Sequence, residues 1–225
     1  MRVLGIDSST FMLSMSLMED DKLIFDVNIR QEKTMAESLQ PTLAGLMKDQ
    51  DLKIEDIDLY GIGVGPGSFT GLRIGVAAVK TFARIFDKKV VGVSSLRAMA
   101  HSLAGHKTIF PLVDARRDRC YRGIYSFSGE RLERIKEDEA VHIEEIINEI
   151  REYEDVILLG DVFKQYGNYF DGDVKIAPAN LFYPRASSIA ILALEDYYNG
   201  IYSSPYEVEI EYLKPSQAER DRENA

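Results

Sequence analysis

The chain has 225 residues and a mass of 25.4 kDa, of which 45% are hydrophobic and 28% charged, a composition that excludes a disordered or fibrous protein. Its single cysteine, Cys120, excludes an internal disulfide, and no apolar run approaches the ~18 residues that span a bilayer. Asp7 interrupts the first apolar run too early for a signal peptide. We therefore expect a cytoplasmic protein without membrane contact.

The net charge of −10 is unevenly distributed along the chain. Residues 137–155 hold nine acidic side chains and one basic one, Arg151, so this segment alone contributes −8. Charge runs of this kind are typical of a solvated helix face, which is our prediction for the segment. Because no basic stripe with interleaved aromatic residues is present, we do not expect the chain to bind DNA or RNA by itself.

Three short strands are predicted at the start of the chain. Apolar runs at residues 3–6, 12–18 and 23–29 favour strands, and their close succession is typical of a meander. The first of these runs ends in a polar loop at residues 7–10.

A helix follows, indicated by the capping-box spacing of Thr34 and Glu37 and by leucines at 39, 43 and 46 on one helical face. Pro41 leaves two alternatives open. Either the helix kinks there, or it begins at Ser38 and holds the proline in its first turn.

The rest of the chain predicts two copies of one arrangement. A strand at 59–64, a long apolar helix at 68–86 and a strand at 89–93 imply parallel pairing through right-handed crossovers. The second half repeats this outline with strands at 109–113, 121–127 and 156–159, helices at 143–150 and 185–198, and an alternating, half-buried strand at 206–212. We expect an α/β fold of two lobes, residues 1–105 and 106–225, with a tail that could return to the first lobe.

A glycine-rich motif, Gly61 to Gly75, lies between a predicted strand and a predicted helix. Free amide groups and the helix dipole would favour an anion there, although the lysine of a P-loop and the full GxGxxG spacing are both missing. A tight strand-to-helix corner explains the spacing equally well. Gly71, Gly75 and Ala78 also fall at helical spacing, which predicts the close approach of another helix, either internal or on another subunit.

Two loops place an aspartate at the end of an apolar strand, residues 7–10 and 114–117. In a two-lobed fold they could face each other across a cleft and handle a metal-bound phosphate, although each aspartate could equally cap a helix or form a turn. His101, His106 and His142 lack the spacing of a zinc site, so no metal site is predicted. The candidate phosphate-binding residues are Asp7, Ser8, Ser9, Thr10, Gly65, Gly67, Ser68, Thr70, Asp114 and Arg116.

At this level the sequence resembles a known family. The run from Gly63 to Gly75, the opening Leu4 to Thr10, Val113 to Arg116 and the closing Tyr212 to Pro215 are similar to the bacterial TsaB proteins, subunits of the tRNA threonylcarbamoyladenosine machinery. The resemblance implies an actin-like fold of the sugar-kinase and actin superfamily, with a reduced second lobe. It also implies a non-catalytic scaffold that dimerises with a TsaD-type catalytic subunit and works with a TsaE-type ATPase.

The same resemblance implies where chemistry is missing. The metal-binding histidine pair of the catalytic relative falls at Ser95 and Met99, which cannot replace imidazole ligands. Many relatives have a histidine where Met35 stands, so the role of that histidine does not transfer. The implied partner interface, which a homodimer could also use, comprises Met35, Leu39, Leu43, Leu46, Gly71, Leu72, Gly75 and Val79.

We expect no tightly bound cofactor, with ATP or ADP and Mg²⁺ as candidates inside the complex, and only indirect contact with tRNA. Two alternatives stay open. The first is a free-standing phosphotransferase of the actin fold, in which Asp7, Ser9, Thr10, Asp114 and the glycine loop would surround Mg-ATP. The second is a glycoprotease, as this superfamily was once labelled, which would need metal ligands that the sequence lacks.

Overall fold

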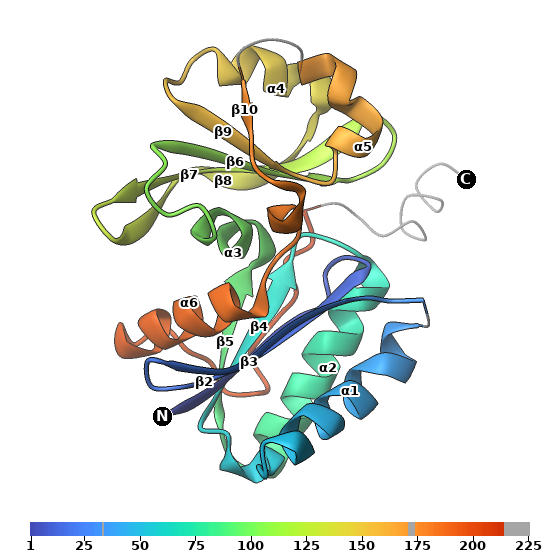
Figure 1. The fold of residues 1–225 in the computed structure, drawn as a ribbon, viewed down its shortest axis with the longest axis vertical. Coiled ribbons are helices and arrows are strands. Elements are labelled where there is room, and N and C mark those ends of the chain that lie inside the picture. The colour runs from blue at the N-terminus through green and yellow to red at the C-terminus, as the bar shows by residue number, and fades with distance from the viewer. Residues whose placement is uncertain (33, 171–173, 214–225) are drawn as a thin grey trace.

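Two five-stranded sheets form the framework of the computed structural model, which describes residues 1–32, 34–170 and 174–213 (Figure 1). The strand order is β3-β2-β1-β4-β5 in the first sheet and β8-β7-β6-β9-β10 in the second, so the two orders match strand for strand. This match confirms the predicted duplication. The strands are β1 (Arg2–Asp7), β2 (Met12–Glu19), β3 (Lys22–Arg30), β4 (Leu59–Gly65), β5 (Lys89–Ser94), β6 (Thr108–Asp114), β7 (Arg119–Ser128), β8 (Arg131–His142), β9 (Val156–Gly160) and β10 (Lys175–Ile176).

Each sheet combines a meander with parallel strands. The first three strands of each copy pair antiparallel, whereas β4 pairs parallel with β1 and β5, and β9 pairs parallel with β6 and β10. The predicted meander and parallel crossovers are therefore confirmed. Strand β8 was not predicted.

The prediction of a solvated helix face for residues 137–155 is wrong in two respects. Residues 137–142 complete β8 and are not helical, although the helix predicted at residues 143–150 is confirmed as α4 (Ile143–Ile150). Asp138 and Glu149 are buried. Strand β8 is the edge strand of its sheet, and its exposed charges are typical of an edge protected against further pairing.

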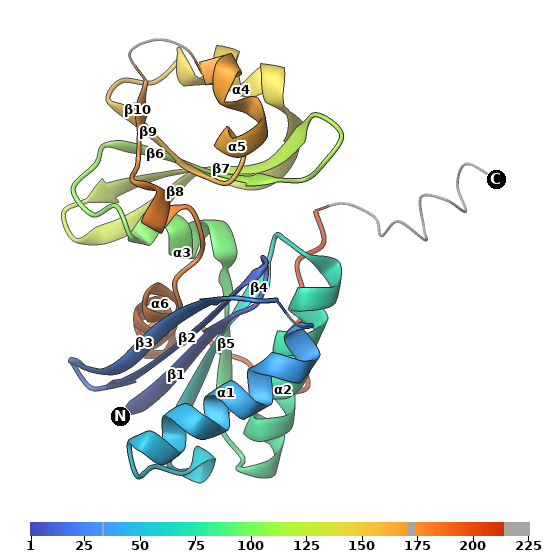
Figure 2. The ribbon, with the colours of Figure 1, turned by 45° about the vertical axis from the view of Figure 1, so that its right-hand side comes forward.

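Helices cover both faces of the first sheet. Helices α1 (Met35–Asp49) and α2 (Phe69–Ile85) lie on one face and α6 (Ala186–Tyr198) lies on the other (Figures 1 and 2). Thr34 donates its backbone N–H to Glu37 Oε2 at 3.1 Å, and α1 begins at Met35. The alternative start at Ser38 is therefore wrong, and Pro41 lies inside the helix.

The second sheet has shorter helices. Helices α4 and α5 (Phe163–Tyr166) pack on it, and α3 (Ser95–His101) lies between the two sheets (Figure 1). The remaining elements are the 3-10 turns η1 (Ile54–Asp56), η2 (Gly167–Phe170) and η3 (Ala179–Leu181). None of the helices in the described part of the chain combines the length and apolar character that crossing a bilayer requires.

The chain returns to the first sheet after building the second. Residues 106–225 were expected to form the second lobe with a tail that could return to the first, and the return already includes α6, which packs against β1, β2 and β4. We call the sheet β1–β5 with α1, α2 and α6 the first lobe, and β6–β10 with α4 and α5 the second lobe.

Residues 201–213, here named the C-terminal strap, run along the first lobe. The strand predicted at 206–212 is wrong, because this segment has no strand conformation. Val208 and Ile210 pack into the core of the first lobe, which explains the alternating pattern. Lys80 Nζ donates to the Val208 carbonyl at 2.9 Å and the Glu211 amide donates to the Val64 carbonyl at 2.9 Å. The strap therefore packs against α2 and the end of β4.

Candidate functional site

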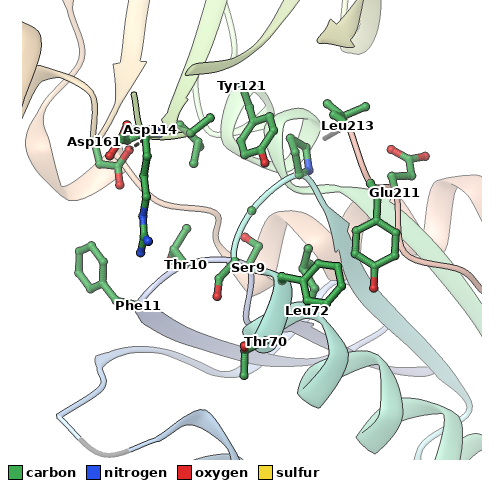
Figure 3. Close-up of a pocket in the computed structure, with 18 of the residues that line it drawn as sticks. Ser9, Thr10, Phe11, Thr70, Leu72, Asp114, Tyr121, Asp161, Glu211 and Leu213 are labelled. Carbon is green, nitrogen blue, oxygen red and sulfur yellow. Dashed lines mark hydrogen bonds between the residues drawn. The ribbon is translucent and has the colours of Figure 1, made fainter. Parts of the chain in front are cut away.

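A cavity of about 610 Å³ lies between the two lobes, at the ends of β1, β4, β6 and β9 (Figure 3). Ligands of α/β sheets commonly bind outside the carboxyl ends of the strands, and this cavity has that position. Its lining residues are Ser9, Thr10, Phe11, Pro66, Gly67, Ser68, Phe69, Thr70, Leu72, Val113, Asp114, Ala115, Arg116, Arg117, Tyr121, Asp161, Glu211, Tyr212 and Leu213.

The structure brings most of the candidate phosphate-binding residues together. Those that line the cavity are Ser9, Thr10, Gly67, Ser68, Thr70, Asp114 and Arg116. Asp7, Ser8 and Gly65 do not line it. The two aspartate loops thus meet the same cavity, but they contribute to it differently.

Asp7 is engaged inside the first lobe. Its Oδ1 accepts hydrogen bonds from the Ser9 amide at 2.9 Å and the Ser9 hydroxyl at 2.7 Å, and its Oδ2 accepts from the Ser95 hydroxyl at 2.8 Å. Burial raises the pKa of the carboxyl group above its ordinary value, and the three hydrogen bonds oppose this effect. With 1% of its surface exposed, Asp7 fixes the conformation of its loop.

The glycine motif accommodates that loop. A Cβ atom at Gly67 would lie 2.2 Å from the Ser9 carbonyl oxygen, and one at Gly71 would lie 2.1 Å from the Ser8 carbonyl oxygen. The Ser68 amide donates to the Ser9 carbonyl at 2.6 Å. The close approach predicted at this face of the helix is therefore internal, and a loop rather than another helix makes it.

Asp114 and Asp161 lie side by side in the second lobe's wall of the cavity (Figure 3). The Asp114 amide donates to Asp161 Oδ1 at 2.8 Å, and the Arg116 amide donates to Asp114 Oδ1 at 2.8 Å. Burial raises the pKa of Asp161, although the amide of Asp114 opposes the shift. Asp161 was not among the predicted site residues. The available signal was its position, since it follows an apolar strand as Asp7 and Asp114 do.

The strap supplies a wall that the sequence did not indicate. Glu211, Tyr212 and Leu213 line the cavity. The Arg73 Nε atom donates to the Tyr212 hydroxyl at 3.1 Å, and burial raises the pKa of Glu211. The alternating pattern of residues 206–212 predicts a strand and contains no sign of a cavity wall.

The residues implied as a partner interface pack mostly inside the chain. Leu46 is partly buried, and the others are buried within the first lobe: Met35, Leu39, Leu43, Gly71, Leu72, Gly75 and Val79. The exposed residues of the same two helices are different ones, among them Ala44, Ala77 and Thr81.

Ser95 and Met99, at the positions of the catalytic relative's histidine pair, are both buried on α3. Ser95 donates to Asp7, and Met99 belongs to an apolar cluster that includes Leu96 and Leu103. Among residues 1–32, 34–170 and 174–213, no group of three or more His, Cys, Asp or Glu side chains is placed to hold a metal ion.

Two matched sheets with a cavity between the lobes define an actin-like fold. A model of the family described as TsaD, tRNA N6-adenosine threonylcarbamoyltransferase, matches residues 29–219. The chain belongs to this family.

Curated relatives agree with the resemblance to TsaB proteins. The tRNA threonylcarbamoyladenosine biosynthesis protein TsaB of Bacillus subtilis (strain 168) is 29% identical over 201 residues, which cover 87% of this chain and 88% of the relative. TsaB of Escherichia coli (strain K12) is 31% identical over 154 residues, 63% of this chain and 65% of the relative. These relatives confirm the resemblance.

Solved structures confirm the fold. YeaZ from Pseudomonas aeruginosa superposes with a TM-score of 0.84 at 22% identity, covering 94% of this chain and 99% of that one. An uncharacterized protein from the same organism with similarity to peptidase YeaZ also gives a TM-score of 0.84, at 21% identity and with coverage of 95% and 99%. The actin-like fold expected from the sequence is therefore observed.

Proposed function

We propose that the chain is a non-catalytic scaffold subunit of the complex that places a threonylcarbamoyl group on the adenosine beside the anticodon of tRNA. The matched family and the TsaB relatives support a part in tRNA threonylcarbamoyladenosine biosynthesis. In this role the chain binds a TsaD-type catalytic subunit in the cytoplasm and helps to assemble it with a TsaE-type ATPase.

One observation carries the scaffold assignment, namely how α3 uses the two positions that correspond to the catalytic relative's histidine pair. The Ser95 hydroxyl donates to the buried Asp7, and the Met99 side chain is fully buried in an apolar cluster. Neither side chain offers an imidazole nitrogen, and both are occupied by internal packing. The metal chemistry of the reaction therefore falls to the partner.

The outer face of α1 and α2 is the surface that we assign to this partner. Ala44, Ala77 and Thr81 are exposed there, and small side chains let a second helix approach closely. Beside them lies a groove of about 520 Å³. Its lining includes Leu43, Met47, Leu52 and Phe82. The same face could serve a homodimer when the catalytic subunit is absent.

Co-purification tests this assignment. The tagged chain is expressed with the TsaD-type protein of its host, and the product is sized by gel filtration with light scattering. Ala77→Arg places a long cation on the exposed face of α2 and is expected to abolish the heterodimer. Asn148→Arg makes a similar change on the exposed face of α4 in the other lobe and is expected to leave the heterodimer intact.

If the heterodimer still formed with Ala77→Arg, the interface would have to lie outside this face of α2. Absence of any complex with the wild-type chain, together with steady ATP hydrolysis by the chain alone, would overturn the scaffold role in favour of an independent phosphotransferase.

The cavity between the lobes supports a nucleotide site, on which the phosphotransferase alternative would also depend. Mg²⁺ prefers oxygen ligands and is usually held by one or two carboxylates together with substrate phosphates. Asp114 and Asp161 offer such carboxylates, and Ser9 and Thr10 offer hydroxyl groups on the facing wall. We propose that ATP or ADP with Mg²⁺ occupies this cavity inside the complex, with Asp114 and Asp161 toward the cation.

A further inference from the structure

An exposed aromatic side chain, Phe11, lies at one edge of the cavity, on the side of Asp114 and Asp161 (Figure 3). Its ring meets the Tyr183 ring edge to face, with centroids 4.8 Å apart. Arg30 Cζ lies 5.4 Å and Lys164 Nζ lies 4.9 Å from the centroid of the Phe11 ring. Two cations from different lobes therefore converge on one aromatic ring.

Two further cations reach the same cavity from the loop after β6. Arg116 and Arg117 line the cavity together with Phe11, and both are exposed. Their φ angles are +61° and +57°, and that of Asp118 is +56°. Three consecutive non-glycine residues in the left-handed region are unusual, and such strain concentrates at functional sites.

These four cations have no ion pair within the described residues. Two carboxylates of the same cavity wall, Asp114 and Asp161, each accept a hydrogen bond from a backbone amide. The acidic excess of the chain lies elsewhere, largely in residues 137–155. A positive, aromatic rim therefore exists on a chain whose net charge is negative. We name the set Phe11, Arg30, Arg116, Arg117, Lys164 and Tyr183 the cationic rim.

We propose that the cationic rim binds a single-stranded segment of RNA, with one unpaired base stacked on Phe11 and the neighbouring phosphates held by the four cations. This inference rests on the proposed function, which brings an RNA substrate to the complex. Proteins that bind single strands combine an aromatic stacking surface with a positive groove along the backbone, and the rim has both parts. Contact with tRNA is then direct, not only indirect as the net charge suggested.

The distribution of the cations favours a strand over a free nucleotide. They come from three separate segments, with Arg30 at the end of β3, Lys164 on α5 and the arginine pair in the 115–118 loop. A mononucleotide carries its phosphates on one side of the base only. A strand carries a phosphate on each side of the stacked base and can reach cations that come from separate segments of the chain.

The test measures binding of a fluorescent anticodon stem-loop RNA to the reconstituted complex by anisotropy at several salt concentrations. Replacing both arginines, Arg116→Gln with Arg117→Gln, is expected to weaken the affinity at least 10-fold and to reduce the slope of log K against log salt by about 1.4. Phe11→Leu keeps an apolar side chain but removes the ring, and is expected to weaken binding about 5-fold or more without changing that slope.

Lys107→Gln provides the matched control. Lys107 is exposed and precedes β6, at the opposite end of that strand from Asp114, so removal of its charge is expected to leave RNA binding unchanged. Thermal unfolding of each variant verifies that the fold is retained.

Affinities of the Arg116/Arg117 and Phe11 variants within twofold of wild type would overturn the inference. Equal binding of a blunt duplex would overturn it too. Gel filtration separates the two hypotheses. If the complex forms but these substitutions do not change its affinity for RNA, only the proposed role of the cationic rim is wrong. Failure of the wild-type complex to form would contradict the scaffold role itself.

Discussion

The two lobes share one strand order, but the loops that follow their first strands differ in how far they are buried. After β1, the loop at residues 7–10 is covered by the glycine-bearing start of α2, and Asp7 is buried beneath it. After β6, Asp118 of the loop at residues 115–118 is tied to α5 through the Tyr166 hydroxyl at 3.3 Å, but Arg116 and Arg117 stay exposed. The two corresponding loops therefore differ: one is packed inside the first lobe, and the other keeps two arginines exposed at the cavity.

The lobes also hold their first helix differently. Helix α1 packs on its sheet through apolar side chains such as Leu39 and Leu43. Helix α4 adds an ionic contact, in which Glu149 lies between Arg122 and Lys136. The first lobe thus depends on close packing and the second in part on buried charge, and substitutions in each lobe can test this difference.

The largest effect is expected in the second lobe. Arg122 is 2% exposed, and its Nε lies 2.8 Å from Glu149 Oε2. Glu149→Ala would leave this buried guanidinium with the half-exposed Glu139 as its carboxylate partner and the Glu137 carbonyl as a neutral acceptor, and is expected to cost about 3–5 kcal/mol in the free energy of unfolding. Denaturant unfolding of the purified chain measures this.

Glu139→Ala is the control, because Glu139 contacts the same arginine at 3.0 Å from a half-exposed position. Its loss is expected to cost about 0–1 kcal/mol. If the two substitutions lowered the free energy of unfolding equally, burial of the Arg122–Glu149 ion pair would not determine its contribution to stability.

The second effect tests close packing in the first lobe. Gly71→Ala would place a Cβ atom 2.1 Å from the Ser8 carbonyl oxygen, so the loop or the helix must move. We expect a loss of about 2–4 kcal/mol in the free energy of unfolding. The measurement is thermal or denaturant unfolding.

Gly45→Ala is the matched control on α1, where a new Cβ atom meets nothing within 4 Å. It is expected to stabilise the chain by about 1 kcal/mol, because alanine favours a helix interior over glycine. If both glycines tolerated alanine equally, the loop would not need the glycine motif. Gly75→Arg would also disturb this packing, since a Cβ atom there would lie 2.2 Å from the Ser8 hydroxyl.

The smallest effect concerns pH. Burial raises the pKa of Asp7 above 3.8, so the folded chain holds this proton more tightly than the unfolded chain. Stability therefore falls as pH rises from about 3.8 to the folded pKa, by about 1.4 kcal/mol per pH unit in that window. Asp7→Asn cannot ionise, so its stability relative to wild type is expected to increase with pH there.

Ser95→Ala is expected to change the dependence of stability on pH in the direction opposite to that of Asp7→Asn. It removes a hydrogen bond that favours the Asp7 carboxylate, so the pKa rises further and the window extends upward. If the stability of wild type and of Asp7→Asn changed equally with pH, burial would not raise the pKa of Asp7.

The sequence predicts the strands and helices whose side chains follow a clear period. The meander at residues 2–30 and the apolar helix α2 are examples: β1 and most of β2 are apolar runs buried on both faces, and α2 buries an apolar face. Strand β8 escaped prediction because both its faces carry charges at the edge of the sheet. Residues 206–212 alternate because Val208 and Ile210 contact the core from an irregular segment, and alternation alone cannot distinguish this from a strand.

The cavity was predictable only in part. Aspartates at strand ends identified Asp114, and the same rule applied to Asp161 would have found the second carboxylate. The burial of Asp7 depends on tertiary contacts with Ser95 and α2, far away in the sequence. Glu211 reaches the cavity because the strap returns across the first lobe, which no local pattern encodes.

The position of α6 has a consequence for synthesis of the protein. This helix covers the face of the first sheet where a Cβ atom at Gly5 would lie 2.2 Å from the Ala186 carbonyl oxygen. During translation the ribosome releases all strands of the first sheet, and then the whole second lobe, before α6 emerges. The first lobe is therefore the first to be synthesised and the last to be completed. One apolar face of its sheet stays exposed until residues 186–198 have been synthesised and can pack on it.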